Sequence, residues 1–402
     1  MRPITCTKHD PEAVQAALDL IGTGLSIRET ARKTGIPSST LRGHIKAGKL
    51  EDLPEELEAQ NRVLKFELNR IRGERDSARD LQVFLEDVVK RSIAPITWKA
   101  SPAKIPKPKR SDEAEVAMLD LSDMQIGSIV RPHEVMGLNT YNLEVFKERL
   151  QLLVEKVIHI TEGLQSSRRI DTLIVNFLGD IVEGELIFEH QPFEIEADLL
   201  TQIFVAADEL VGALLTFAQH FKEVKVYAVP GNHGRASKRN SPNLNFDTIV
   251  YRFIEQRLAL QRNIRIYCSD GPCMGYEEPE GWLHVIQHGD NIRSYLSIPY
   301  YGLDRAASRM SALLMTQVRY YHIGHHHSAG YIPNAACTRI LNGSFVGTSR
   351  FSANEMQTGD VPVQWFMGYH PKYGKTWLYD LRLDEPVTLT PDQDGILFGK
   401  RR

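Results

Sequence analysis

Five short segments after residue 115 each end an apolar, β-like run with oxygen- or nitrogen-bearing side chains. Ligand sites in open α/β sheets lie beyond the carboxyl ends of the strands, so we expect these side chains to meet at one edge of a sheet. Carboxylate, amide and imidazole groups without a thiolate suit hard or borderline divalent ions. The segments together offer seven candidate metal ligands: Asp123, Gln125, Asp180, Asn232, His288, His325 and His327.

The size of this set indicates two divalent metals. Seven candidates exceed the four ligands of a tetrahedral site. If Asp180 bridges the two ions, they would lie about 3.5–4 Å apart, as in two-metal phosphoryl-transfer centres. Mn²⁺ is the first candidate, and Fe²⁺, Zn²⁺ and Mg²⁺ are the others.

The order of the motifs resembles the calcineurin-like metallophosphoesterase superfamily over residues 115–350. The motifs are Asp-x-Gln, Gly-Asp-x-x-Glu, Gly-Asn-His, a single His and Gly-His-x-His. The resemblance implies a β-sandwich flanked by helices, with both metals at one edge. It assigns Asp123, Gln125, Asp180 and His327 to one metal, and Asp180, Asn232, His288 and His325 to the other.

The same resemblance implies two catalytic residues. His233 would face the leaving group as an acid or charge stabiliser, and Glu183 would orient it. Two positions depart from the family pattern: Gln125 stands where the family usually has His, which predicts a looser metal, and Gly234 replaces an acid. The arginine-bearing motif of the protein Ser/Thr phosphatases is absent, which excludes that branch.

The expected reaction is phosphoester hydrolysis, with DNA as the first candidate substrate. Arg235, Lys238 and Arg239 follow the Gly-Asn-His motif and favour a polyanion. The layout resembles the repair-exonuclease branch of the superfamily and similar phage-encoded proteins. Two alternatives stay open: a nucleotide or small-molecule phosphodiesterase or phosphatase, and a non-catalytic DNA-binding adaptor with a phosphoesterase-like scaffold.

Residues 1–50 predict a small all-α domain of three helices. Ser26 and Glu29 form a capping-box pattern, and Gly35 can end the second helix in the left-handed conformation. The spacing of Ala31, Gly35 and the later Leu41 resembles a helix-turn-helix. Its third helix would enter a DNA major groove.

In this interpretation Arg42 and Lys46 would contact DNA phosphates. A protein-interaction module of the same shape is the alternative.

Residues 51–91 predict a coiled-coil or long helix. Apolar residues recur every seven positions, at Leu57, Leu64, Ile71, Ala78 and Leu85. This period favours a homodimer or higher homo-oligomer through residues 55–91, and the alternative is a single helix lying on another domain. Residues 92–114 form a Pro/Lys-rich linker, and residues 115–402 form the catalytic domain, an α/β four-layer sandwich.

Composition limits the other classes of protein. The 402 residues are 42% hydrophobic with a net charge of −3, which excludes collagen-like and wholly disordered chains. The four cysteines form no Cys-x-x-Cys pair, which predicts reduced thiols. With no secretory signal pattern and no apolar run long enough to span a bilayer, we expect a cytoplasmic protein of a bacterial or phage-infected host cell, without membrane contact.

Overall fold

The chain divides into two units, residues 1–77 and 78–402. The computed structural model describes residues 11–46, 79, 113–189, 191–237, 244–294, 299–385, 387–391 and 397–401. The predicted helix 51–91 lies outside the described residues except for Arg79, as do most of the linker 92–114 and both Lys238 and Arg239. The predicted homodimer through residues 55–91 therefore stays a prediction.

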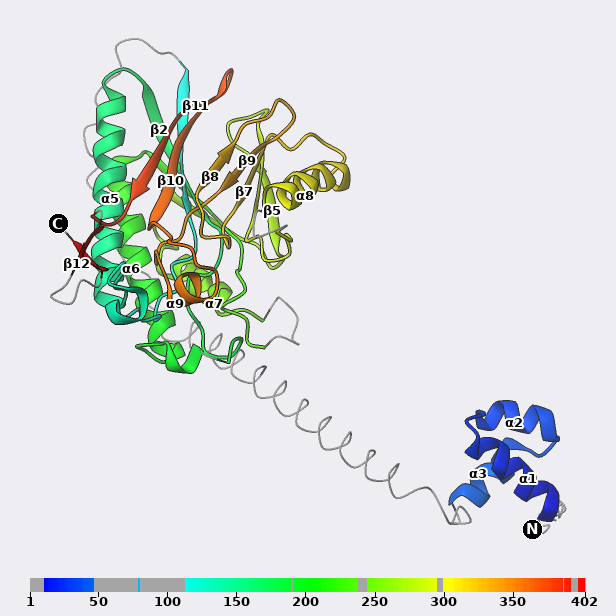
Figure 1. Cartoon of the computed structure of the whole chain (residues 1–402). Helices are drawn as coiled ribbons and strands as arrows, with labels where there is room; N and C mark the ends of the chain where they lie inside the picture. The colour runs from blue at the N-terminus through cyan, green and yellow to red at the C-terminus, as the bar shows by residue number, and fades with distance from the viewer. Residues whose placement is uncertain are drawn as a thin grey trace. The chain divides into compact units, whose positions relative to one another are not determined.

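The described part of the N-terminal unit is a bundle of three helices. They are α1 (Pro11–Gly22), α2 (Ile27–Thr34) and α3 (Ser38–Lys46) (Figure 1). The Ser26 hydroxyl accepts from Glu29 N at 3.3 Å and the Glu29 carboxylate accepts from Ser26 N at 3.2 Å, so the predicted capping box is present. Gly35 follows α2 with φ 71°. A small buried core unites the helices through Val14, Ala17, Leu18, Ile36 and Leu41.

The larger sheet of the second unit has six strands in the order β11-β10-β1-β2-β3-β4. Strands β1 to β4 are parallel, and β10 and β11 extend the sheet antiparallel. The strands are β1 (Ala114–Leu121), β2 (Arg169–Phe177), β3 (Glu223–Ala228), β4 (Ile264–Cys268), β10 (Val363–His370) and β11 (Gly374–Arg382).

The smaller sheet has five strands in the order β5-β6-β7-β9-β8. Strands β6, β7 and β9 are parallel, and β5 and β8 are antiparallel at the edges. Their bounds are β5 (Cys273–Glu277), β6 (Leu283–Gln287), β7 (Tyr320–Ile323), β8 (Gly330–Ile332) and β9 (Thr338–Leu341). Two further strands, β12 (Val387–Pro391) and β13 (Leu397–Arg401), pair only with each other among the described strands.

Helices cover the outer faces of both sheets. α5 (Leu143–Gln165), α6 (Leu199–His220) and α7 (Phe246–Arg257) pack on the larger sheet, and α8 (Tyr300–Leu313) packs on the smaller one (Figure 1). Short helices η1 (Pro132–Val135), η2 (Gln191–Phe193) and α9 (Arg350–Asn354) lie in connecting segments.

Alternation along β1 explains the layers. Ala117 and Leu119 face the helices, whereas Val116 and Met118 face the second sheet. The predicted α/β sandwich of four layers, preceded by a small helical domain, is confirmed.

The ends of the parallel strands lie level with one another. Leu121 pairs with Phe177, Phe177 pairs with Ala228, and Gln287 pairs with Ile323. Each of these strand ends precedes a predicted ligand segment by a few residues. Because of this register, the segments that carry the candidate ligands all begin at the same edge of the sandwich.

Contrary to the expectation that no apolar run is long enough, one helix among the described residues, α6, could cross a bilayer by length and composition alone. Its most apolar window has a mean hydropathy of 1.5, and 56% of that window is buried in the protein. Its buried residues include Ile203, Leu210 and Leu214, which belong to the main core. Such burial is typical of a core helix in a globular protein.

The small core of the N-terminal unit makes a specific stability prediction. Leu41 is 0% exposed, and truncation of a buried leucine costs about 2–5 kcal/mol. We expect Leu41→Ala to abolish hydrogen-exchange protection of peptides from residues 11–46 in the full-length protein. The neighbouring exposed variant Arg42→Ala should keep that protection, and equal protection in both variants would show that Leu41 does not hold this core.

Candidate metal centre

Backbone hydrogen bonds join the segments that carry the candidate ligands. Asp123 N donates to Gly179 O at 3.1 Å, and Gln125 N donates to Asp180 O at 2.9 Å. His325 N donates to both oxygens of the Asp123 carboxylate, at 3.1 Å each. The segments after β1, β2 and β7 thus form one connected layer at the edge of the sandwich.

Many candidate ligands have unusual backbone conformations. Left-handed φ values occur at Asp123 (53°), Gln125 (42°), Asp180 (53°), His325 (67°) and His327 (55°). Only Met136, Met315 and Gln357 share this property among the other described residues that are not glycine. Each such backbone conformation costs about 1–3 kcal/mol of folding free energy, and such conformations cluster at functional sites. This concentration of strain supports a functional site.

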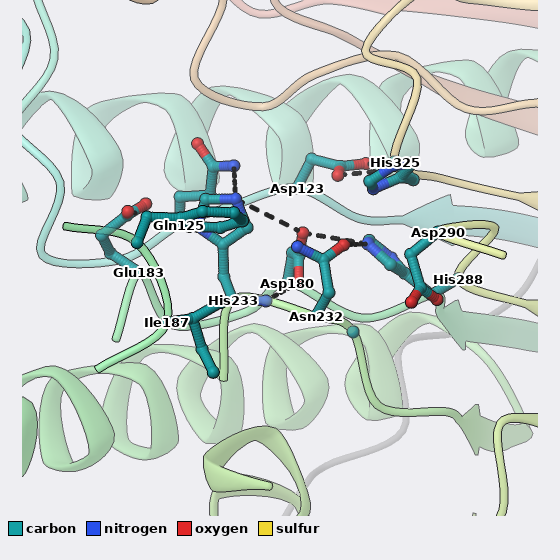
Figure 2. Close-up of polar contacts among 12 residues, drawn as sticks. Asp123, Gln125, Asp180, Glu183, Ile187, Asn232, His233, His288, Asp290 and His325 are labelled. Carbon is teal, nitrogen blue, oxygen red and sulfur yellow. Dashed lines mark hydrogen bonds and ion pairs between the residues drawn. The ribbon is translucent and has the colours of Figure 1, made fainter. Parts of the chain in front are cut away.

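The innermost group consists of Asp180, His288 and His325. One ligand atom from each lies within 4.8 Å of the others, and Asp180 and His288 are each 1% exposed. His288 Nε2 lies 2.9 Å from Asp180 Oδ2 and 2.9 Å from Asn232 Oδ1 (Figure 2). His288 Nδ1 donates to Leu178 O at 2.8 Å, which fixes the ring so that Nε2 faces the other ligands.

The remaining candidates lie beside this group. Asp123 Oδ1 is 3.3 Å from His327 Nε2, and Asp123 is 0% exposed. The side-chain amide nitrogen of Gln125 lies 3.4 Å from His233 Nε2. The structure therefore brings all seven predicted side chains to one edge, whereas their roles as ligands stay a prediction.

The residues fit a divalent cation. Asp180 Oδ2 is buried and lies 2.9 Å from His288 Nε2, and a buried carboxylate is costly unless a positive charge faces it, a place that a divalent cation can take from the imidazolium. A carboxylate, an amide oxygen and two imidazole nitrogens surround this point, and this donor set suits Mn²⁺, Fe²⁺ or Zn²⁺.

Charge within the site shifts the pKa values of its ionisable groups. Burial favours the neutral form of His288, but the Asp180 carboxylate outweighs this effect and raises the pKa of His288 to about 9. Burial also opposes ionisation of Asp180, yet His288 and His233 hold its pKa well below the ordinary range. Burial and the neighbouring His288 lower the pKa of His325 to about 3. The metal-free site is therefore an internal ion pair beside a neutral imidazole.

The predicted catalytic pair lies beside the ligands. His233 Nδ1 is 3.1 Å from Glu183 Oε1, and Gln191 Nε2 donates to the same oxygen at 3.3 Å. His233 Nε2 lies 4.0 Å from Asp180 Oδ2. Burial opposes the imidazolium, but the Glu183 and Asp180 carboxylates raise the pKa of His233 to about 10. His233 can therefore hold a proton near neutral pH.

The predicted DNA contacts stay a prediction. Arg235 Nη2 forms an ion pair with Asp290 Oδ2 at 2.6 Å, so its charge is already compensated. Arg42 is exposed on α3, and the side chain of Lys46 lies outside the described residues. No structural finding tests these contacts.

Two carboxylates at the site escape detection from the sequence. The carboxylate of Asp247 is buried and accepts backbone N–H groups from Asp180 and Gly231. Asp360 Oδ2 lies 3.9 Å from His327 Nδ1. Neither residue follows a parallel strand, so the strand-end pattern could not find them. The sequence Asn245-Phe246-Asp247 carried only the signal of a helix N-terminus.

This chain has low similarity to several solved structures. A dimetal phosphatase from Danio rerio is 11% identical, with a TM-score of 0.35 over 68% of this chain and 100% of that one. Vps29 complexed with Zn²⁺ from Entamoeba histolytica is 11% identical, with a TM-score of 0.31 over 66% and 99%. An archaeal phosphodiesterase is 12% identical, with a TM-score of 0.30 over 66% and 99%. Scores of this size carry no argument about function, which depends on the site itself.

One family model matches this chain, within the N-terminal unit. A search of curated proteins gives no match. The family model HTH_psq, described as a helix-turn-helix Psq domain, matches residues 10–52. This match covers the three helices and confirms the predicted helix-turn-helix, whereas the repair-exonuclease and phage resemblance stays a prediction. Residues 10–52 therefore form a helix-turn-helix segment that is similar to the Psq domain.

Proposed function

We propose that this protein is a metal-dependent phosphoesterase that hydrolyses phosphodiester bonds in DNA. One observation carries the proposal: the buried carboxylate of Asp180 lies among His288 and His325, with the His233–Glu183 pair beside it. A cation site next to a protonated imidazole is what phosphoester hydrolysis needs, since charge must be neutralised and a leaving group protonated.

Two metals, with Mn²⁺ as the first candidate, complete this proposal. Asp180, Asn232, His288 and His325 would hold one, and Asp123, Gln125, Asp180 and His327 would hold the other. When bound, they would supply charge neutralisation at the phosphoryl oxygens and activation of water.

His233 is the proposed general acid. Its backbone N–H donates to Asp180 Oδ1 at 2.8 Å, which ties the residue to the ligand group. The Glu183 carboxylate accepts a hydrogen bond from Nδ1–H, so Nε2 faces Asp180 and Gln125. When Nε2 is protonated, it can donate this proton to a departing alkoxide. The phenyl ring of Phe188 lies 5.0 Å from the imidazole and limits its movement.

DNA as the substrate rests on the helix-turn-helix segment. Residues 10–52 match a class of DNA-binding fold, and α3 carries the exposed Arg42. A small-molecule phosphodiesterase is the second candidate, because the ion pair between Arg235 and Asp290 leaves less free positive charge near His233 than the sequence suggests.

The catalytic assignment predicts the behaviour of two variants. With Mn²⁺ present, His233→Ala should lower kcat about 10²–10⁴-fold, because the leaving group loses its acid. Asp180→Asn should also lower the rate, because the site loses its buried charge. Hydrolysis of bis(4-nitrophenyl) phosphate and of linear DNA measures both effects.

Asp171→Asn is the matched control, since this carboxylate binds Arg169 and Lys222 at the other end of β2. Full activity in both site variants would make the assignment wrong. Turnover of cyclic nucleotides without DNA cleavage would favour the small-molecule enzyme, and DNA binding without any hydrolysis would favour the adaptor.

Metal binding should release protons. The metal-free pKa of His288 is raised to about 9, so this imidazole is protonated at pH 7 and must lose its proton to bind a metal. We therefore expect Mn²⁺ affinity to rise with pH and to level off above pH 9. Calorimetric titration in buffers of different ionisation enthalpy counts the protons released, and the same low count at pH 7 and pH 9.5 would contradict this prediction.

DNA binding should be sensitive to salt. If Arg42 contacts a phosphate, Arg42→Ala should reduce the slope of log affinity against log salt by about 1. Fluorescence anisotropy of labelled duplex DNA between 50 and 200 mM salt (about the range in which such effects are large) measures this slope. Arg262→Ala removes the same charge from the second unit and is the control. An unchanged slope for Arg42→Ala would contradict the contact.

A further inference from the structure

The carboxylate of Asp247 lies directly behind the two central ligand segments. Asp247 belongs to the first turn of α7 and is 0% exposed. Its Oδ2 accepts from Asp180 N and Gly231 N, at 2.9 Å each. Its Oδ1 accepts from Ile181 N at 3.1 Å and from Val182 N at 3.2 Å. One side chain therefore satisfies four backbone donors from two different segments.

These four donors belong to the segments that carry the proposed chemistry. The first contains Asp180 and leads to Glu183, and the second leads from Gly231 to Asn232 and His233. Their backbones touch, since a Cβ at Gly179 would lie 2.4 Å from Gly231 N, and Gly179 has φ 90°. Without Asp247 these buried N–H groups would have no acceptor, and each unsatisfied group costs about 1–3 kcal/mol.

Asp247 does not serve its own helix. The N-cap of α7 is Asn245, whose side chain accepts from Asp247 N at 2.9 Å. Asn245 Nδ2 also donates to Gly231 O at 2.7 Å. The Asp247 oxygens point away from α7 to the ligand segments, so a capping role does not account for them.

The residue after His233 makes room for this arrangement. A Cβ at Gly234 would lie 2.6 Å from Asn245 Oδ1 and 3.1 Å from Asp247 Oδ1. Any side chain at Gly234 would therefore collide with the side chain of Asn245 and crowd that of Asp247, and both of these side chains bind the ligand segments. This gives a local reason for glycine at that position.

We propose that Asp247 is a positioning residue that holds both ligand segments in their metal-binding conformation before the metals bind. This inference rests on the proposed function, because it assumes that Asp180 and Asn232 hold a metal. Its effect would be on metal affinity, through the backbone conformation of Asp180 and the spacing of the two segments. Partners that orient metal ligands typically affect affinity about 10–100-fold.

Hydrogen exchange of the metal-free parent protein tests the preorganisation directly. Peptides covering residues 179–184 and 229–233 should be protected without metal, because Asp247 already accepts their N–H groups. Exchange of these peptides at the rate of unstructured chain, with protection appearing only on addition of Mn²⁺, would overturn the proposal.

A titration of Mn²⁺ into the metal-free variant Asp247→Asn tests the consequence. In this variant the new side-chain amide turns its own N–H donors toward backbone N–H groups, which are also donors. We therefore expect Mn²⁺ affinity to fall at least about 10-fold. The far-ultraviolet circular dichroism should be unchanged. Val250→Ala, which truncates a buried side chain of α7, is the control for lost stability, and Asp171→Asn is the control for lost charge. Both controls should bind Mn²⁺ like the parent protein.

The outcomes separate this proposal from the proposed function. Affinity of Asp247→Asn within twofold of the parent overturns the positioning role. A fall of the same size in Val250→Ala also overturns it, because general destabilisation then explains the loss. If the parent binds no Mn²⁺, or if Asp247→Asn does not fold, the exchange result for the parent decides the role of Asp247. Binding of no Mn²⁺, Fe²⁺, Zn²⁺ or Mg²⁺ by the parent overturns the proposed function.

Discussion

A carboxylate charge buried where two sheets meet is the constraint on which the rest of the structure depends. Asp180 is 1% exposed, and a lone carboxylate in such surroundings would take up a proton. His288 at 2.9 Å and His233 at 4.0 Å instead keep it ionised and hold its pKa low. The charge that a cation needs therefore exists before any cation arrives, and the protein stabilises it with groups that a cation can replace.

Strain accompanies this charge. Asp123, Asp180 and His325 all have left-handed backbone conformations, which cost free energy and need neighbours that hold them. Hydrogen bonds between segments supply this support, from Asp123 N to Gly179 O and from His325 N to the Asp123 carboxylate. The level strand ends of both sheets fix the positions from which these segments start. The sandwich thus stabilises conformations that these segments would not keep alone.

The sequence predicts the parts of the site that follow directly from strands. Asp180 and His288 come after apolar runs, and parallel strands carry such ends to one edge, so their meeting was predictable. Asp247 was not, because its partners are backbone N–H groups, which leave no mark in a sequence. The pairing of Arg235 with Asp290 was also hidden, since it joins residues far apart in the chain. Side-chain types and the ends of strands can be predicted from the sequence. Contacts between loops cannot, because they depend on the folded path of the backbone.

Gln125 and Gly234, where this sequence departs from the motifs that it resembles, each have a local physical explanation in this site. The side-chain amide nitrogen of Gln125 lies 3.4 Å from His233 Nε2. A histidine at that position would bring a second imidazole against a group whose pKa is already raised to about 10, and two like charges there would repel. The amide of Gln125 carries no charge and so adds no such repulsion. At Gly234, the space is filled by Asp247 and Asn245. Gln125 therefore adds no charge beside His233, and Gly234 leaves the space that Asn245 and Asp247 need to bind the ligand segments.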